Sequence, residues 1–272
     1  MTAETLFAVD GRVVVVTGGL GRLGSGFARS LRERGARVAV LDIDASQGRV
    51  DSVFSDARAS DNLQVIEADI LDKASLNRAL VTIAERWEVP FGLVNNAAID
   101  SPPGAPVAEN GPFEDYPESS WDKVLDVNVK GTLLASQVFG GAMAAAGRGS
   151  IVNICSTYGM VSPDQSLYEY RRQSGDSFFK PVAYSASKSA ILNLTRYMAT
   201  YWAPNVRVNT LTFGGVFDNQ DPRFLEGYAR RTPLKRMAKP GEYDGAVVFL
   251  MSDAASYMTG SNMVIDGGWT AW

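Results

Sequence analysis

Short runs of apolar residues, many of them β-branched, recur along the whole chain and alternate with stretches whose apolar positions have helical spacing. These runs cover residues 12–16, 37–41, 63–68, 91–94, 150–154, 206–211 and 263–265. Consecutive apolar residues, rather than alternating ones, are typical of strands that are buried on both faces of a parallel sheet. The pattern therefore predicts an α/β fold, a doubly wound sheet of about seven parallel strands with helices on both faces.

Three segments interrupt this alternation, at residues 99–120, 157–181 and 213–240. Each follows the carboxyl end of a predicted strand, which is the edge where an open α/β sheet binds its ligands. We therefore expect them to form the loops that contact a small-molecule substrate. No linker rich in Pro, Gly or Ser separates the strands into groups, so the sequence predicts one domain over residues 1–272.

Composition narrows the possible partners. The hydrophobic fraction is 46% and the charged fraction 21%, as in ordinary globular proteins. A formal net charge of −4 argues against a nucleic-acid partner. No apolar run reaches the roughly 20 residues of a membrane span, and the first residues lack the pattern of a signal peptide. We expect a cytoplasmic protein with no membrane partner.

The chain contains one cysteine and no histidine. This composition excludes an internal disulfide, a Cys-rich zinc site and every His-based catalytic arrangement, so no metal is expected. Acid–base chemistry must then use Tyr, Lys, Asp, Glu or Cys. Cys155 ends an apolar run and has no histidine to activate it, so we interpret it as a core residue rather than a nucleophile.

A glycine-rich stretch, Thr17–Gly24, joins the first predicted strand to the first helix. Glycines there let the backbone approach a pyrophosphate, and the helix N-terminus offers free N–H groups to the anion. Asp42 follows the second strand at 42 − 18 = 24 positions after Gly18, near the roughly 20 expected for the acid that binds the ribose hydroxyls of NAD. Its charge favours NAD over NADP, although Arg22 offers a nearby cation. The alternative is a surface aspartate that caps the next segment.

A second group of residues has the chemistry of proton transfer. Tyr184 and Lys188 are four positions apart, so on a helix they share one face. An ammonium beside a phenol stabilises the phenolate and would lower the tyrosine pKa from about 10. Ser156, at the end of a strand, adds a hydroxyl for a substrate oxygen, and Asn128 adds a polar group inside an apolar helical pattern. Each of these residues taken alone is more often structural.

Taken together, these motifs resemble the short-chain dehydrogenase/reductase family over nearly the whole chain. The resemblance rests on 17–24, Asp42, Asp69, 95–98, Asn128, Ser156, Tyr184 with Lys188, and 266–268. It implies a Rossmann fold and an NAD(P)-dependent oxidoreductase that moves a hydride between a nicotinamide and a hydroxyl or carbonyl substrate. It also implies a homotetramer, with interfaces at the helices around 121–139 and 183–201 and at the final strand.

The same resemblance assigns roles to residues. Tyr184 would be the proton donor or acceptor, Ser156 would polarise the substrate oxygen, Lys188 would hold the nicotinamide ribose and tune Tyr184, and Asn128 would position a water of the proton relay. Asp69 would contact the adenine, Asn95 the cofactor-side backbone, and Val216 would lie near the carboxamide. The full set of expected cofactor contacts is Gly18, Gly21, Arg22, Leu23, Asp42, Asp69, Ile70, Asn96, Ala97, Ala98, Tyr184, Lys188, Gly214 and Val216.

Three positions depart from the family pattern: Arg22 stands where the middle glycine belongs, Ala98 ends the Asn-Asn-Ala-Gly turn, and Phe213 replaces the proline before Gly214. A weaker similarity, over 197–202, 207–211, 232–234 and 258–272, is to flagellin-modification-type oxidoreductases. It points to a sugar or sugar-phosphate substrate in bacterial surface-glycan biosynthesis.

Two other functions fit parts of the sequence. A non-catalytic dinucleotide-binding sensor would share the fold but would not need the set of Asn128, Ser156, Tyr184 and Lys188. A nucleotide-sugar epimerase or dehydratase usually has a longer C-terminal substrate domain. In the 157–181 loop, Arg171, Arg172 and Lys180 are matched in number by Asp164, Glu169 and Asp176, which favours a neutral lid over an anion-binding one. Two tryptophans in 269–272 are costly to leave in water, so we expect this tail to dock.

Overall fold

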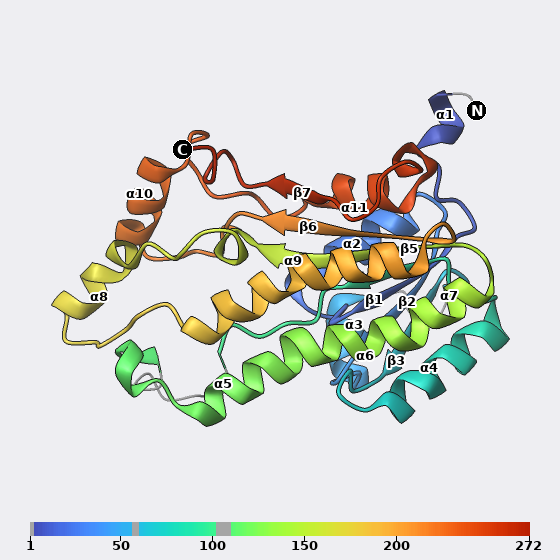
Figure 1. Ribbon diagram of the computed structural model, residues 1–272, viewed down its shortest axis with the longest axis horizontal. Helices are drawn as coiled ribbons and strands as arrows, with labels where there is room; N and C mark the ends of the chain where they lie inside the picture. Colours follow the sequence, from blue (N-terminus) through green and yellow to red (C-terminus); the bar gives the residue numbers. More distant parts are fainter. Residues whose placement is uncertain (1–2, 56–59, 102–109) are drawn as a thin grey trace.

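A single seven-stranded parallel sheet runs through the molecule, with the strand order β3-β2-β1-β4-β5-β6-β7 (Figure 1). The computed structural model describes residues 3–55, 60–101 and 110–272. The strands are β1 (Val13–Thr17), β2 (Arg37–Asp42), β3 (Leu63–Glu67), β4 (Gly92–Asn95), β5 (Gly149–Ser156), β6 (Val206–Phe213) and β7 (Asn262–Ile265). Each lies within two residues of its predicted bounds, which confirms the α/β class.

Helices connect the strands and cover the sheet. They are α1 (Ala3–Leu6), α2 (Arg22–Arg32), α3 (Gln47–Val53), α4 (Lys73–Arg86), α5 (Glu118–Leu125), α6 (Gly131–Ala135), α7 (Gly141–Ala145), α8 (Glu169–Gln173), α9 (Val182–Trp202), α10 (Pro222–Arg231) and α11 (Asp244–Met251). Helices α5 to α7 form one continuous rod in Figure 1, because π-helical turns at Asp126–Lys130 and Ser136–Gly140 join them.

The sheet divides the core into two layers. Val14 and Val16 of β1 pack in the cluster on one face, with Phe27 of α2 and residues of α11. Val13 and Val15 point to the other face, where they join the cluster formed with α4, the α5–α7 rod and α9. Because successive side chains of a strand point to opposite faces, a strand covered on both sides needs consecutive apolar residues. This requirement explains the uninterrupted valines of the first run.

The order of the strands reverses at β1, which lies between β2 and β4. The carboxyl ends of the parallel strands, at Thr17, Asn95, Ser156 and Phe213, therefore meet at one edge of the sheet. All three irregular segments leave the sheet at this edge, although residues 102–109 of the first lie outside the described residues. Within the part of the chain that the structure describes, no helix is long and apolar enough to cross a membrane.

Candidate active site

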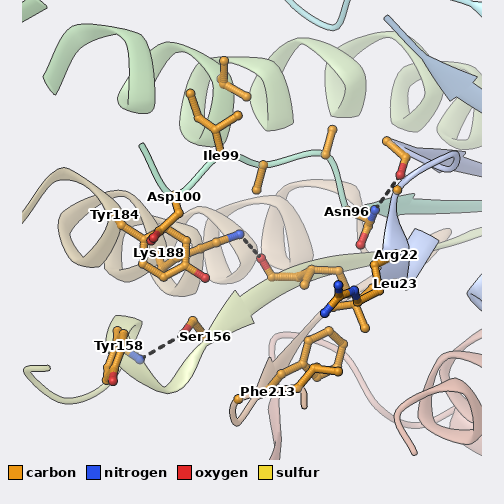
Figure 2. A pocket seen from close by; sticks show the side chains of 18 of the residues that line it. Arg22, Leu23, Asn96, Ile99, Asp100, Ser156, Tyr158, Tyr184, Lys188 and Phe213 are labelled. Atoms are coloured by element: carbon orange, nitrogen blue, oxygen red, sulfur yellow. Dashed lines mark hydrogen bonds between the residues drawn. The ribbon is translucent and has the colours of Figure 1, made fainter. Parts of the chain in front are cut away.

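A cavity of about 1230 Å³ follows the carboxyl edge of the sheet. Figure 2 shows that its walls come from the glycine-rich turn, the segment after β4, β5 and α9. All fourteen residues expected to contact a cofactor line it: Gly18, Gly21, Arg22, Leu23, Asp42, Asp69, Ile70, Asn96, Ala97, Ala98, Tyr184, Lys188, Gly214 and Val216. Positions far apart in the sequence therefore line one cavity.

The glycine-rich turn is held against the segment that follows β4. Gly18 has a φ of +60°, and a Cβ atom there would lie 2.8 Å from the Cα of Ala97, so only glycine fits. The Thr17 hydroxyl accepts the N–H groups of Asn96 and Ala97, and the Asn96 amide donates to the carbonyls of Thr17 and Gly18. Asn95, expected to meet the cofactor-side backbone, is instead buried and donates to Ser136 and Asn153, so the contact with that turn belongs to Asn96.

Asp42 closes the far end of the cavity. Its carboxylate accepts the N–H of Leu20 at 3.0 Å and that of Asp44 at 3.3 Å, which holds it at the carboxyl end of β2. Arg49 donates to the carbonyl of Leu20 at 3.1 Å and also lines the cavity. A cation therefore binds the same turn as Asp42. The sequence reasoning missed Arg49, because only the hydrogen bond to Leu20 brings it to this turn.

Arg22 replaces a family glycine and has a specific partner. Its guanidinium forms an ion pair with Asp218, from the segment after β6, and both side chains are about half exposed. Figure 2 shows Arg22 reaching from the start of α2 toward Phe213. Arg22 is thus paired with Asp218, and Arg49 is a second cation, on the Asp42 turn; an offset of the Asp42 charge by Arg22 stays a prediction.

The three residues expected to carry proton transfer meet at the other end of the cavity (Figure 2). Ser156 ends β5, and Tyr184 and Lys188 lie one turn apart on α9, which packs along that strand. The Ser156 hydroxyl accepts the backbone N–H of Tyr158 at 3.2 Å and lines the same cavity as the Tyr184 phenol. The Lys188 ammonium lies 5.8 Å from the centre of the Tyr184 ring and donates to the carbonyl of Ile154 at 3.0 Å.

The electrostatics of Tyr184 differ from the expectation that Lys188 lowers its pKa. Burial raises the pKa of Tyr184 well above its usual value, the Asp100 carboxylate adds to this effect, and the neighbouring Ser156 hydroxyl opposes it. Burial also lowers the pKa of Lys188 to about 8. The expectation is wrong here because desolvation of the phenol outweighs the attraction of an ammonium that is itself buried and bonded to a carbonyl.

Asn128 lies within the first π-helical turn and outside the set of described residues that line the cavity. Its side-chain oxygen accepts the N–H of Ile99 at 2.8 Å, and its amide donates to the Ile99 carbonyl and to the Ser187 hydroxyl, both at 2.9 Å. Ser187 in turn donates to the backbone carbonyl of Tyr184. Asn128 therefore ties the segment after β4 to the turn of α9 that carries Tyr184, and its role with a relay water stays a prediction.

The charged side chains of the 157–181 loop are all paired, as their equal numbers suggested. Two of the cations pair within the loop, whereas the third pairs with a residue outside it. Arg171 pairs with Asp176 and Arg172 with Glu169, each at 2.7 Å. Lys180 instead crosses to Asp100, in the segment after β4, at 2.6 Å. The third acid of the loop, Asp164, pairs with Arg231 of α10. Counting residues in the sequence predicts that positive and negative charges in this loop are equal in number. Only the fold shows that Lys180 pairs with Asp100.

Aromatic residues form a third cluster over the substrate end, separate from the two core layers. Tyr168 packs against Phe178 and Phe224, and Trp269 stacks on Tyr228 at 4.6 Å between ring centres. The expected docking of the tail is confirmed for Trp269, which is 6% exposed, whereas Trp272 remains 79% exposed.

Cys155 is confirmed as a core residue: it is buried, and burial raises the pKa of its thiol.

Comparison with known proteins gives this geometry a context. The family model described as enoyl-(acyl carrier protein) reductase matches residues 21–270. The NAD-dependent glycerol dehydrogenase of Listeria innocua is 32% identical, with 97% of this chain and 96% of that protein covered. The galactitol 2-dehydrogenase (L-tagatose-forming) of Cereibacter sphaeroides is 33% identical over the full length of both chains.

The chain belongs to the short-chain dehydrogenase/reductase family. Among solved structures of this family, a gluconate 5-dehydrogenase from Burkholderia cenocepacia in complex with NADP and tartrate superposes with a TM-score of 0.85, at 25% identity and with full coverage of both chains. The family membership and the Ser156–Tyr184–Lys188 geometry make the protein an NAD(P)-dependent oxidoreductase acting on hydroxyl or carbonyl groups. The non-catalytic sensor is therefore set aside.

Proposed function

We propose that this protein is an NAD-dependent dehydrogenase of polyols or sugar alcohols, acting reversibly between a secondary hydroxyl and the corresponding ketone. The observation that carries the proposal is a single cavity with Ser156, Tyr184 and Lys188 at one end and the Asp42 carboxylate at the other. Relatives that are named glycerol and galactitol dehydrogenases support the substrate class. A role in bacterial surface-glycan biosynthesis stays a prediction.

The residues at the substrate end would move one proton. In oxidation, the Ser156 hydroxyl holds the substrate oxygen while the Tyr184 phenolate accepts its proton. The bound nicotinamide supplies the hydride acceptor. Because burial keeps the pKa of Tyr184 high, the phenol stays protonated near neutral pH and so carries the proton that the reverse reaction, the reduction of a ketone, requires. Lys188 holds the ribose and stabilises the phenolate when its ammonium is charged.

The cavity fits a dinucleotide by its donors and its shape. The close approach of Gly18 to Ala97 leaves backbone rather than side chains at the start of α2, where N–H groups favour a pyrophosphate. Asp42 would bind the ribose hydroxyls, Asp69 and Ile70 would lie beside the adenine, and Val216 near the carboxamide. We propose NAD over NADP because the Asp42 carboxylate repels a 2′-phosphate, with Arg49 as the opposing charge.

We also propose that the three irregular segments form the substrate loops of a single catalytic domain and that the protein is a homotetramer. Support for assembly comes from exposed apolar side chains where the interfaces are expected. Tyr197 and Tyr201 of α9 stack on each other and are 66% and 68% exposed, and Val264 lies on the edge strand β7. A second copy would cover them. Light scattering of the purified protein tests this, and a mass of 29.3 kDa at micromolar concentration would contradict it.

A cytoplasmic location stays a prediction.

A substrate screen over polyols, sugars and sugar phosphates, followed by NADH absorbance, tests the activity directly. We expect oxidation of at least one neutral polyol with NAD and slower oxidation of sugar phosphates. Turnover restricted to sugar phosphates would contradict the proposed substrate class, and no turnover with any alcohol or ketone would contradict the activity.

A further inference from the structure

The active site contains an ion pair that the family resemblance did not assign. The Lys180 ammonium lies 2.6 Å from a carboxylate oxygen of Asp100 and 5.0 Å from the centre of the Tyr184 ring, closer to that ring than Lys188. Asp100 and Lys180 both line the cavity. Figure 2 shows Asp100 directly beside Tyr184 and Lys188. The pair therefore borders the place where the reacting oxygen must bind.

Both ends of this ion pair are held in place by the backbone. Asp100 follows Ile99, whose N–H and carbonyl are both bonded to the Asn128 side chain. The backbone of Lys180 donates to the Gln165 side chain at 2.9 Å and accepts from it at 3.3 Å. The Lys180 side chain is only 16% exposed, whereas that of Asp100 is 46% exposed. The charges are thus fixed before a ligand arrives, and the carboxylate remains open to the cavity.

The chemistry of the pair matches a hydroxyl group. A carboxylate only accepts hydrogen bonds and an ammonium only donates them, whereas a hydroxyl does both. Because the two charges cancel, the pair offers no net attraction to an anionic substrate. Arg171, the other cation that lines the cavity from the 157–181 loop, is neutralised by Asp176.

We propose that Asp100 and Lys180 form a subsite that binds a second hydroxyl of the substrate, on the carbon next to the reacting one. Ser156 and Tyr184 hold the reacting oxygen, and the ion pair holds its neighbour. The substrate class is therefore a neutral vicinal diol. This inference rests on the proposed function and deepens it, and it makes Asp100 and Lys180 substrate-binding residues.

Two substrates that differ by one hydroxyl test the subsite, butane-2,3-diol and butan-2-ol. We expect kcat/KM of the unmodified protein to favour the diol by about 10- to 100-fold, as for hydrogen bonds to charged groups. Asp100→Asn and Lys180→Met should each reduce this preference at least several-fold, mainly through KM of the diol. The controls are Glu88→Gln and Arg148→Met, which break a more exposed ion pair remote from the cavity and should preserve the preference.

The pH dependence of oxidation gives a second measurement, which a merely structural tether would not change. Tyr184 faces Ser156, Cys155, Tyr158, Asp100, Lys180 and Lys188. Removing the negative charge in Asp100→Asn favours the phenolate, so the rise of kcat/KM with pH should move to lower pH. Removing the positive charge in Lys180→Met should move it to higher pH. Shifts of the kcat/KM profile in opposite directions would support an ion pair whose charges act on Tyr184. Equal shifts in the two variants, or no shift in either, would contradict the proposal.

The outcomes separate this subsite from the function on which it rests. If the unmodified protein oxidises polyols but does not prefer the diol, or if both variants keep the full preference, the subsite is overturned and the proposed function stands. If the unmodified protein oxidises no alcohol with NAD, both are overturned. A variant that loses NADH binding, measured by fluorescence, is misfolded at the site. The diol preference of the other variant then decides whether the subsite exists.

Discussion

The two ends of the cavity are built in different ways. At the dinucleotide end, Gly18, Asn96 and Asp42 lie directly at the ends of strands, and hydrogen bonds between side chains and backbone, from Asn96 to Gly18 and from Leu20 to Asp42, connect these strand ends. At the substrate end, the walls come from segments far apart in sequence, which meet through side chains such as Tyr168, Phe224 and Trp269. The comparison teaches that a ligand common to a family is held by the sheet, whereas a ligand specific to one protein is held by loops packed on loops.

The largest expected effect lies where the two ends meet. Tyr184→Phe should lower kcat by roughly 10²- to 10⁴-fold, because it removes the phenol oxygen that we propose transfers the proton, while the ring still packs. Binding of NADH, measured by fluorescence titration, should be nearly unchanged. The matched control is Tyr197→Phe, an exposed tyrosine on the same helix, which should keep full activity. Wild-type turnover in Tyr184→Phe would show that another group transfers the proton.

The aromatic cluster is expected to stabilise the substrate end. Trp269→Ala should lower the free energy of unfolding by about 3–5 kcal/mol, because it removes a buried ring stacked on Tyr228. Trp272→Ala should change it by less than about 0.5 kcal/mol, because that ring is largely exposed. Urea unfolding at fixed protein concentration compares the two. Equal effects would mean that Trp272 is buried in the assembled protein.

The preference for NAD over NADP depends on the dinucleotide end of the cavity and so tests that end separately from the substrate end. Asp42→Ala should reduce kcat/KM with NAD by roughly 10- to 100-fold and leave that with NADP unchanged or raised, since one carboxylate both binds the ribose and repels the phosphate. Arg49→Gln should have the opposite effect and widen the preference for NAD. Steady-state kinetics with both cofactors measures this. An unmodified protein that prefers NADP would show that Arg49 outweighs Asp42.

The smallest expected effect concerns the ion pair that links the two ends. Arg22 and Asp218 are half exposed, so separating them should cost no more than about 1 kcal/mol of stability. Asp218→Asn frees a cation beside the first turn of α2 and should tighten NADH binding a few-fold, whereas Arg22→Gln should weaken it. Titrations at low and high salt check this, because the difference should shrink with salt. Equal changes in both variants would contradict it.

Much of the dinucleotide end was readable from the sequence. Strand bounds, the glycine-rich turn and Asp42 depend on local chemistry and on a regular repeat, and the structure places them within one or two residues of expectation. Arg49 was missed because its importance depends on a hydrogen bond to Leu20 that no spacing rule describes. The direction of the Tyr184 pKa shift was wrong for a related reason: burial is a property of the packed protein and not of the motif.

The sequence by itself determined the sheet, its two-sided burial and the positions of Ser156, Tyr184 and Lys188, because each follows from side-chain periodicity or from the geometry of a helical turn. Only the tertiary structure decided the partners of charges. Lys180 is 80 positions from Asp100, and Arg22 is far from Asp218 in the chain, yet both pairs form because parallel strands bring their carboxyl ends to one edge. A charge shows its sign in the sequence, but its partner depends on which loops the fold makes neighbours.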